Sequence, residues 1–326
     1  MLLLTAADVL ALAPLPAAID AVERAFVELS AGRATAPVRP RIETTAPPGV
    51  MLCMPAAVPA VGALGAKLVT IFDDNPRQGK PLVHAVVVLI DPGDGAPLAL
   101  LDGRLLTALR TGAASGVATR HLARPEAAVL TCFGAGALAE HQIAAVLAVR
   151  PIRRVVLCSR TLARAEALAE QLRARWPAVE IVVERDPGRA AAQADVICTA
   201  TTASTPVFPA AAVRPGTHIN GVGAHTAAMA EVPAELVARA RVVVDQRDAA
   251  RVEAGDLIQA VAAGLVDERV FATELGEVAA GTAPGRTGPD EITFFKSVGN
   301  AVQDVAVARL AVDAARRLGR GQVVAL

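Results

Sequence analysis

The feature that most constrains this chain is a glycine-rich turn between an apolar run and an amphipathic segment. The run 127–133 is continuously apolar and stops at Gly134, and the apolar spacing over 138–149 predicts a helix. The turn between them reads Gly134-Ala135-Gly136-Ala137-Leu138-Ala139. In a G-x-G-x-x-A turn the glycines allow a tight bend and close approach of a pyrophosphate, and the small last residue lets the helix pack on the strand. An ordinary strand–helix turn is the alternative, but the position of this one favours dinucleotide binding.

Strand-like and helix-like segments alternate after this turn. Short apolar runs recur at 154–158, 180–183, 194–199, 217–222 and 241–244, and the spacing over 163–175 predicts another helix. Alternation of strands with helices is typical of a parallel sheet, and continuously apolar strands indicate burial on both faces. The sequence therefore predicts an α/β fold with a Rossmann-type, doubly wound parallel sheet.

The chain before residue 127 has a different texture. Helical spacing over 17–30 precedes three strand-like segments at 51–55, 66–72 and 82–91, which turn signals separate, and a helix is predicted over 105–123. Near the other end, 297–318 reads as one long alanine-rich helix. These segments predict a second α/β region outside the parallel sheet.

Composition argues against several classes of function. Among 326 residues the 32 basic side chains equal the 32 acidic ones, so the chain lacks the positive surface that nucleic acids and anionic membranes attract. Aromatic residues make up only 2%, too few for base stacking. We find no apolar run of the roughly 20 residues that span a bilayer. Four cysteines without CxxC spacing suggest reduced, buried thiols, no metal site and a cytoplasmic location.

The end of the second predicted strand bears on the choice of dinucleotide. An acidic residue there would bind the ribose 2′-hydroxyl of NAD(H). This chain has Ser159-Arg160-Thr161 instead. A guanidinium and two hydroxyls suit a 2′-phosphate, although an arginine at a loop tip is often merely solvated. The sequence favours NADP(H) and leaves NAD(H) possible.

Three basic residues interrupt less polar surroundings in the first region: Arg41, Lys67 and Arg110. Any one of them alone would more often be a surface charge with a buried stem. Together, ahead of a nucleotide-binding sheet, they could bind a carboxylate.

Several short motifs then occur in a familiar order. They are Lys67-Leu68-Val69-Thr70, Leu109-Arg110-Thr111-Gly112, Gly134-Ala135-Gly136, Ile219-Asn220-Gly221-Val222-Gly223, Glu274-Leu275-Gly276-Glu277-Val278 and Phe295-Lys296-Ser297-Val298-Gly299. In these motifs, from about Pro40 through Asp304, the chain resembles the ornithine cyclodeaminase/mu-crystallin family. That family includes ornithine cyclodeaminases, alanine dehydrogenases of the archaeal type and ketimine reductases.

The resemblance implies a domain plan and a set of site residues. Residues 1–118 with 299–326 would form a substrate-binding and dimerisation domain of a homodimer, and 119–298 the NAD(P)-binding Rossmann domain. Arg41, Lys67 and Arg110 would hold the substrate carboxylate, and Lys67 could also transfer a proton. His84 would lie near the substrate, although a hydrogen-bonded strand histidine is an equal alternative. The implied cofactor contacts are Thr111, the turn Gly134, Ala135, Gly136, Ala137 and Leu138, then Ser159, Arg160, Thr161, Thr199, Ala200, Thr201, Val222 and Ser297.

The chain departs from the cyclodeaminase pattern at two positions. His225 follows Val222-Gly223-Ala224 where cyclodeaminases carry an acid/base aspartate, and Leu52 stands where they carry a glutamate. A second substrate amine needs a polar partner, which Leu52 does not offer. Relatives also often have glutamine where Leu138 stands, which concerns one cofactor contact.

These observations predict an NAD(P)H-dependent imino-acid (ketimine) reductase. Hydride would pass to an imine carbon beside a carboxylate, as in pyrroline-2-carboxylate or piperideine-2-carboxylate, while Lys67, His225 or water handles the proton. Three alternatives stay open: an ornithine cyclodeaminase that recycles NAD⁺ and releases proline and ammonia, an alanine dehydrogenase, and a non-catalytic, crystallin-like ligand-binding protein. No nucleic-acid or membrane partner is expected.

Overall fold

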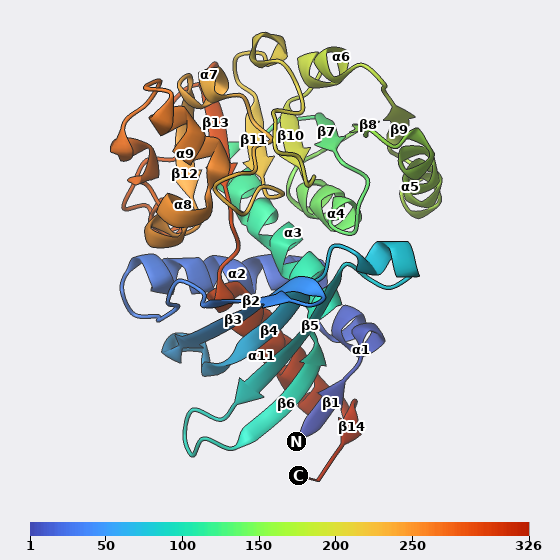
Figure 1. Cartoon of the computed structure of the whole chain (residues 1–326), viewed down its shortest axis with the longest axis vertical. Helices are drawn as coiled ribbons and strands as arrows, with labels where there is room; N and C mark the ends of the chain where they lie inside the picture. Colours follow the sequence, from blue (N-terminus) through green and yellow to red (C-terminus); the bar gives the residue numbers. More distant parts are fainter. Residues whose placement is uncertain (326) are drawn as a thin grey trace. The chain divides into compact units, whose positions relative to one another are not determined.

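The computed structural model describes residues 1–325 of the chain. The chain divides into a first unit, Met1–Arg110 with the segment from Asn300 onward, and a second unit, Thr111–Gly299. Both the first unit and the second contain a seven-stranded sheet (Figure 1). The helix α3 (Gly103–Leu122) contributes residues to both units.

The first unit joins the N-terminal strands and helices to the C-terminal helix. Its elements are β1 (Leu2–Leu4), α1 (Ala6–Leu12), α2 (Leu15–Ser30), β2 (Arg41–Thr45), β3 (Pro48–Val58), β4 (Ala63–Ile71), β5 (Val83–Ile90), β6 (Pro97–Asp102), the start of α3, α11 (Ala301–Leu318) and β14 (Gln322–Val323). The strand order is β14-β1-β6-β5-β4-β3-β2, and β2 through β6 are joined by antiparallel pairing.

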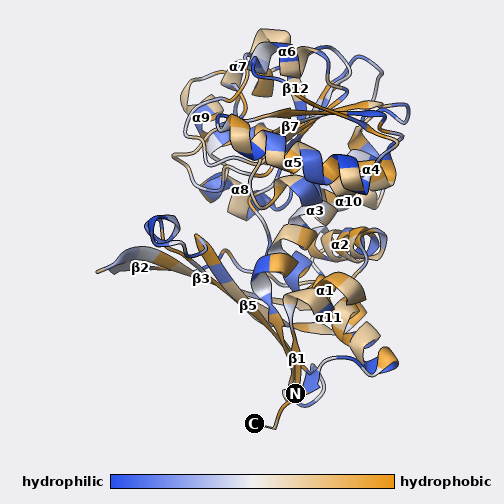
Figure 2. Ribbon diagram, turned by 90° about the vertical axis from the view of Figure 1, so that its right-hand side faces the viewer, coloured by the Kyte–Doolittle hydropathy of each residue, from blue (hydrophilic) through white to orange (hydrophobic). Residues whose placement is uncertain are grey.

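Helices cover one face of this sheet. In Figure 2, α1, α2 and α11 lie on one side of the strands, and α11 packs against β3, β4 and β5. Side chains alternate between the faces of a strand, so Leu52, Met54 and Val69 are buried under the helices, whereas Leu68 and Val86 point to the other face and are exposed. We call the first the helix-covered face and the second the bare face.

The second unit contains the predicted alternation of strands and helices. Its elements are β7 (Val129–Phe133), α4 (Ala139–Val149), β8 (Arg154–Cys158), α5 (Leu162–Arg175), β9 (Glu180–Val183), α6 (Pro187–Ala192), β10 (Val196–Thr199), β11 (His218–Gly221), α7 (Ala234–Val237), β12 (Ala240–Val244), α8 (Arg247–Glu253), α9 (Gly255–Ala262), α10 (Leu275–Ala279) and β13 (Ile292–Lys296).

All neighbouring strands of this second sheet pair in parallel, in the order β12-β13-β11-β10-β7-β8-β9. Two apolar clusters fill the space between the sheet and its helices. From β7 the chain runs outward through β8 and β9 and then returns to β10 on the other side. This reversal is the Rossmann switch point, outside which a dinucleotide binds at the carboxyl ends of the strands. The predicted fold class is confirmed.

The prediction of a helix from Ser297 was wrong at its start. The strand β13 runs through Lys296, and α11 begins only at Ala301. The carboxylate of Asp245 accepts hydrogen bonds from the Ser297 hydroxyl and from the backbone N–H of Val298 and Gly299, which holds this segment in a turn. Asn300 then caps the helix, its side chain accepting from the Val302 N–H at 2.9 Å.

The strand β13 was not predicted because it contains Lys296, which is fully buried. Its ammonium forms an ion pair with Asp256 at 2.6 Å, a partner forty residues earlier on α9. Edge strand β2 was also missed, because all five of its residues are exposed and show no apolar alternation. In the described part of the chain, no helix is long and apolar enough to cross a membrane.

Candidate active site

The predicted phosphate turn lies between β7 and α4. Gly134 has φ +104°, and a Cβ atom there would lie 2.6 Å from the carbonyl oxygen of Ala200, so only glycine fits. A Cβ at Gly136 would meet nothing within 4 Å, which leaves the backbone open on that side. Leu138 directly precedes α4. Free N–H groups at the start of such a helix favour a phosphate.

A cavity of about 580 Å³ opens beside this turn. Ser159, Arg160 and Thr161 line it at the end of β8, as expected for an adenosine-ribose site. Two arginines that the sequence analysis did not select, Arg164 and Arg185, line it as well. Its remaining lining residues are Phe133, Gly134, Ala135, Gly136, Cys158, Pro187, Ala200, Thr201, Thr202, Ala203, Thr205, Pro206 and Val207. The glycine cradle and this cavity fit a dinucleotide.

The predicted contacts on β10, β11 and β13 meet the carboxyl edge of the same sheet. The Val222 N–H donates to the Thr199 carbonyl at 3.0 Å, which joins the loops after β10 and β11. The hydroxyls of Thr199 and Thr201 both donate to Glu231, and that of Ser297 donates to Asp245. The proton of each of these hydroxyls is therefore engaged by a buried carboxylate. Thr111 is buried on α3.

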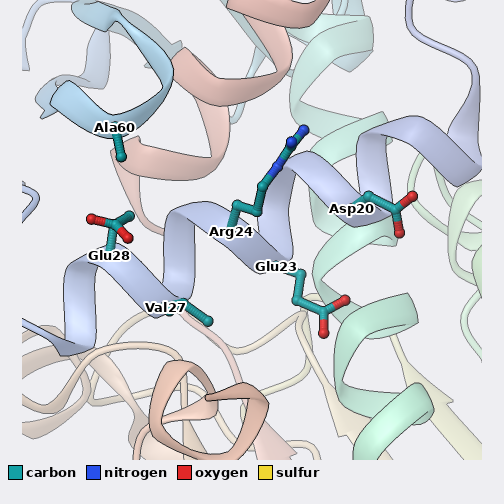
Figure 3. Close-up of a pocket in the computed structure, with 6 residues that line it drawn as sticks. All are labelled: Asp20, Glu23, Arg24, Val27, Glu28 and Ala60. Atoms are coloured by element: carbon teal, nitrogen blue, oxygen red, sulfur yellow. The ribbon is translucent and has the colours of Figure 1, made fainter.

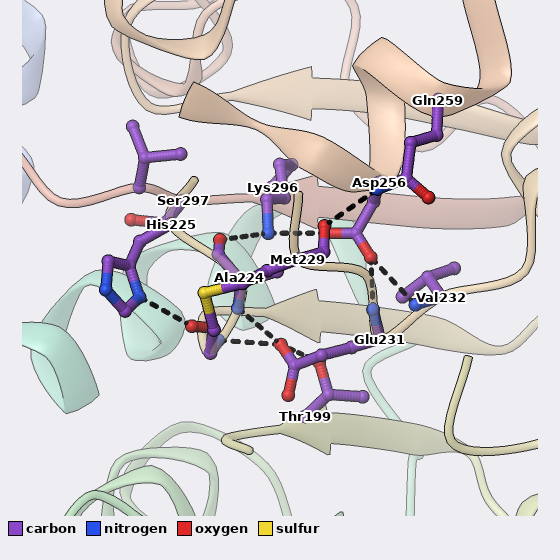
Figure 4. Close-up of polar contacts among 12 residues, drawn as sticks. Thr199, Ala224, His225, Met229, Glu231, Val232, Asp256, Gln259, Lys296 and Ser297 are labelled. Atoms are coloured by element: carbon purple, nitrogen blue, oxygen red, sulfur yellow. Dashed lines mark hydrogen bonds and ion pairs between the residues drawn. The ribbon is translucent and has the colours of Figure 1, made fainter. Parts of the chain in front are cut away.

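His225 lies on the loop after β11 and is half-buried. Its Nδ1 is 2.8 Å from the carbonyl oxygen of Gly223 (Figure 4). A carbonyl oxygen only accepts, so this contact places a proton on Nδ1. In the neutral ring Nε2 is then the basic nitrogen, a suitable group for proton exchange.

Within the first unit, two of the three predicted basic residues meet at one carboxylate. Lys67 Nζ lies 3.0 and 2.9 Å from the two carboxylate oxygens of Asp304, and Arg110 Nε donates to Asp304 at 3.1 Å. Arg110 also donates to the side-chain oxygen of Gln303 at 2.8 Å. We call these four residues the Asp304 cluster. Lys67 is 1% exposed, Arg110 5% and Asp304 0%.

Burial lowers the pKa of Lys67 to about 7, and the nearby Arg110 charge adds to this effect while Asp304 opposes it. The cluster holds two cationic side chains against one carboxylate. An anionic ligand would neutralise the remaining positive charge, and it would also favour the ammonium form of Lys67.

Arg41 is not brought to this cluster. It lies on edge strand β2, 51% exposed, and pairs with Glu43 at 2.9 Å. Arg39 lies two residues before Arg41. When the β2–β3 register is continued, Arg39 lies opposite Met54, which in turn pairs with Lys67 on β4. The Arg39 guanidinium contacts the Met54 sulfur at 3.9 Å, and its charge contributes to the lowered pKa of Lys67. The acid at i+2 on the same strand face, Glu43, was the signal that Arg41 is already paired.

His84 is placed on the wrong face for the predicted substrate role. It pairs with Thr70 on the bare face and is exposed, whereas Lys67 pairs with Val87 on the helix-covered face. His84 and Val87 are three positions apart on the strand, so the alternation of side chains puts them on opposite faces.

A second hollow, of about 480 Å³, lies along α2 in the first unit (Figure 3). Asp20, Glu23, Arg24, Val27, Glu28 and Ala60 line it. Glu28 is occupied by Arg33, whose guanidinium makes two hydrogen bonds of 2.8 Å to it. This hollow has neither a glycine cradle nor a set of buried cations, so each unit keeps one candidate site: the Asp304 cluster in the first unit and the dinucleotide cavity in the second.

Comparison with known proteins identifies the family. The family model described as ornithine cyclodeaminase/mu-crystallin family matches residues 1–318. The chain belongs to this family. The resemblance read from the motifs is thereby confirmed.

Members of the ornithine cyclodeaminase/mu-crystallin family with known names are similar over nearly the whole chain. A Δ1-pyrroline-2-carboxylate reductase from Bacillus cereus is 39% identical over 309 residues, 94% of each chain. The structure of Thermococcus litoralis Δ1-pyrroline-2-carboxylate reductase in complex with NADH and L-proline has 39% identity and a TM-score of 0.96, covering 99% of this chain and 100% of that one. An archaeal alanine dehydrogenase dimer with bound NAD has 34% identity and a TM-score of 0.92, covering 99% and 98%.

The lowered pKa of Lys67 predicts a specific pH dependence of stability. An unfolded lysine titrates near 10.4, so a folded pKa of about 7 means that unfolding takes up a proton between these values and that stability rises with pH across this window, by about 1.4 kcal/mol per pH unit. In Lys67→Met this contribution is absent. Both proteins are unfolded with urea at pH 7, 8 and 9. The free energy of unfolding of the wild type should increase relative to that of the variant at each step in pH. A constant difference would contradict the assignment.

Proposed function

We propose that this chain is an NAD(P)H-dependent reductase of small imino acids, with pyrroline-2-carboxylate as the leading substrate. The observation that carries the proposal is the buried Asp304 cluster, whose two cations face one carboxylate and therefore suit an anionic substrate. The glycine cradle and its cavity supply the place for a dinucleotide. The named reductases that share 39% identity with the chain support the same reaction class.

In this proposal the nicotinamide of the reduced cofactor supplies the hydride that adds to the imine carbon. The chain's own part is orientation and charge. Lys67 and Arg110, with Arg39 on the same sheet face, bind the carboxylate and so fix the position of the adjacent carbon. The imine nitrogen gains a proton as its carbon gains hydride. The Lys67 ammonium can provide this proton, and so can His225 in its imidazolium form, which carries a proton on Nε2.

The surroundings of Lys67 argue for a substrate without a second charged amine. Leu52 and Val69 pair with each other across β3 and β4, and both are buried on the helix-covered face beside Lys67. An ammonium next to these side chains would lose its hydration without gaining a partner. This favours an imino acid over ornithine. The cytoplasmic location stays a prediction.

The cofactor preference is proposed as NADP(H). Arg160 follows β8, Arg185 follows β9 and Arg164 lies in the first turn of α5, and all three line the cavity. Ser159 stands where an acid would select NAD(H). The related structures with bound NADH and NAD show that the fold itself accepts the cofactor without the extra phosphate. The three arginines are the reason to expect a different preference here.

We expect the purified protein to oxidise NADPH in the presence of pyrroline-2-carboxylate, faster than NADH, as followed by absorbance at the reduced nicotinamide band. Arg160→Gln should raise the KM for NADPH by about tenfold or more and change the KM for NADH little, because one charge-assisted hydrogen bond to phosphate is removed. Arg251→Gln, an exposed arginine on α8, is the matched control.

Parallel assays with piperideine-2-carboxylate and with pyruvate plus ammonium define the substrate. Conversion of ornithine to proline and ammonia with NAD⁺, without reduction of any imine, would overturn the proposal in favour of a cyclodeaminase. Equal KM values for NADPH and NADH would leave the reductase standing and remove the role given to Arg160.

The two arginines flanking Pro40 provide a test of carboxylate binding. Arg39→Gln should raise the KM for the imino acid at least about tenfold, because a charge-assisted contact is lost, whereas Arg41→Gln should change it less than about twofold. Steady-state kinetics at saturating NADPH measure both. The reverse ranking would restore Arg41 as the substrate ligand.

We also propose that the chain forms a homodimer through the bare face of the first unit's sheet. Ile42, Leu68 and Val86 lie on this face and are 56%, 39% and 42% exposed. Several large apolar side chains on one uncovered sheet face are typical of an interface. The alanine dehydrogenase relative is itself a dimer.

Sedimentation analysis tests this interface. The wild type should have the mass of two chains, and Leu68→Glu with Val86→Glu should shift it towards one chain, because two charges would be buried in an apolar contact. Leu10→Glu, at an exposed leucine of α1, should stay dimeric. A dimer that survives the double substitution would place the interface elsewhere.

A further inference from the structure

The side chain of Glu231 is a buried carboxylate that the proposed reaction does not use. It is 0% exposed and accepts five hydrogen bonds. One oxygen accepts from the backbone N–H of Thr201 at 2.6 Å and from its hydroxyl at 2.8 Å. The other accepts from the Thr199 hydroxyl at 3.0 Å and from the N–H groups of Gly223 and Ala224 at 2.7 and 2.9 Å.

These five donors come from two different loops. Thr199 is the last residue of β10 and Thr201 lies in the loop after it, whereas Gly223 and Ala224 lie in the loop after β11. The loops are also packed tightly, since a Cβ at Gly223 would lie 2.3 Å from the Thr201 carbonyl oxygen and 2.4 Å from a Glu231 oxygen. The carboxylate therefore joins the end of β10, which lies next to β7 and the phosphate turn, to the end of β11, the next strand along the sheet.

A second layer of contacts fixes Glu231 itself. Asp256 accepts hydrogen bonds from the backbone N–H of Glu231 at 2.6 Å and of Val232 at 2.8 Å. Lys296 forms an ion pair with Asp256 at 2.6 Å and donates to the Ala224 carbonyl at 2.6 Å (Figure 4). All three charged residues are at most 1% exposed. Asp256 thus fixes the backbone of Glu231, and its salt-bridge partner Lys296 contacts the loop after β11.

We propose that Glu231 is a positioning residue for the nicotinamide half of the cofactor. It holds the loops after β10 and β11 in one arrangement, because both oxygens of its carboxylate accept hydrogen bonds from them. This inference rests on the proposed function, because it assumes that a nicotinamide dinucleotide binds at the switch point between β7 and β10. Glu231 itself touches neither reactant; it acts through the backbone of Thr199–Thr201 and Gly223–Ala224.

The chemistry of the contacts requires an ionised acceptor. Burial raises the pKa of Glu231, the charge of Lys296 opposes this, and Asp256 reinforces it. All five partners are donors, so a carboxylate satisfies them and an amide cannot, since an amide nitrogen only donates. In Glu231→Gln one side of the group would place N–H groups against N–H groups. Whichever way the amide turns, one of the two loops loses its acceptor.

The same loop after β11 carries His225, whose Nδ1 contacts the Gly223 carbonyl. The Gly223–Ala224 peptide unit therefore faces Glu231 through the Ala224 N–H and His225 through the Gly223 C=O. Displacing this peptide unit would also rotate the imidazole. Loss of Glu231 is expected to reduce kcat as well as cofactor affinity, without changing the KM for the imino acid at saturating cofactor.

The test separates the two halves of the cofactor. Isothermal titration of Glu231→Gln should show NADPH binding weakened by about tenfold or more, equivalent to the loss of one to two hydrogen bonds at this site. Adenosine 2′,5′-bisphosphate, which lacks the nicotinamide half, should bind within about threefold of wild type. Glu235→Gln, an exposed glutamate on α7, is the matched control and should bind both ligands as wild type does.

Each outcome decides the inference. Equal weakening of both ligands would reduce Glu231 to a residue needed for the unit's overall structure, and unchanged NADPH binding would overturn the proposal. If Glu231→Gln does not fold, Thr199→Val removes a single contact of the same carboxylate and should show a smaller effect with the same selectivity. A wild type that binds NADPH but reduces no imine would overturn the proposed function and leave this test intact.

Discussion

A buried carboxylate is stable only when hydrogen-bond donors or cations surround it. In both units such carboxylates hold the candidate functional residues in place. In the first unit Asp304 gathers Lys67 and Arg110. In the second, Glu231 joins the loops after β10 and β11, and Asp245 shapes the turn after β13. Each of these acids is fully buried. The residues expected to bind ligands are thus positioned by buried carboxylates that need not contact the ligands themselves.

Burial also gives the held groups their chemistry. Lys67 has a pKa near 7 because its ammonium is desolvated beside Arg110, and only Asp304 opposes the effect. A lysine in this state responds to an arriving anion, since the anion restores the charged form. The phosphate turn shows the complementary principle: Gly134 presents backbone rather than charge, and the arginines lie farther along the sheet edge at Arg160 and Arg164. Charge is concentrated at the carboxylate and phosphate positions and absent from the turn.

Some residues were assigned wrongly from the sequence and others were missed, and each case has a physical reason. Arg39 lies just before β2 and Arg41 is the first residue of that strand. Only the neighbouring strand Pro48–Val58 shows that its register, continued to Arg39, aligns Arg39 rather than Arg41 with Lys67. His84 was chosen by position in a motif, but pleating turns it to the bare face. The strand with Lys296 was not predicted, because a lysine interrupts the apolar pattern of a buried strand, and its ion-pair partner Asp256 is apparent only in the folded structure.

The sequence by itself determined the parallel sheet and the family, and it selected the glycine turn and the basic residues Lys67 and Arg110 as candidate ligand contacts. These follow from local patterns: apolar runs of strand length, glycines at fixed spacing and short motifs in a fixed order. Tertiary structure alone decided which carboxylate meets which cation or hydrogen-bond donor, because Lys67 and Asp304 are 237 residues apart and Thr199 and Glu231 are 32 apart. Such pairs leave no periodic signal in a chain, since their partners are chosen by strand register and helix packing, and these exist only once the sheets have formed.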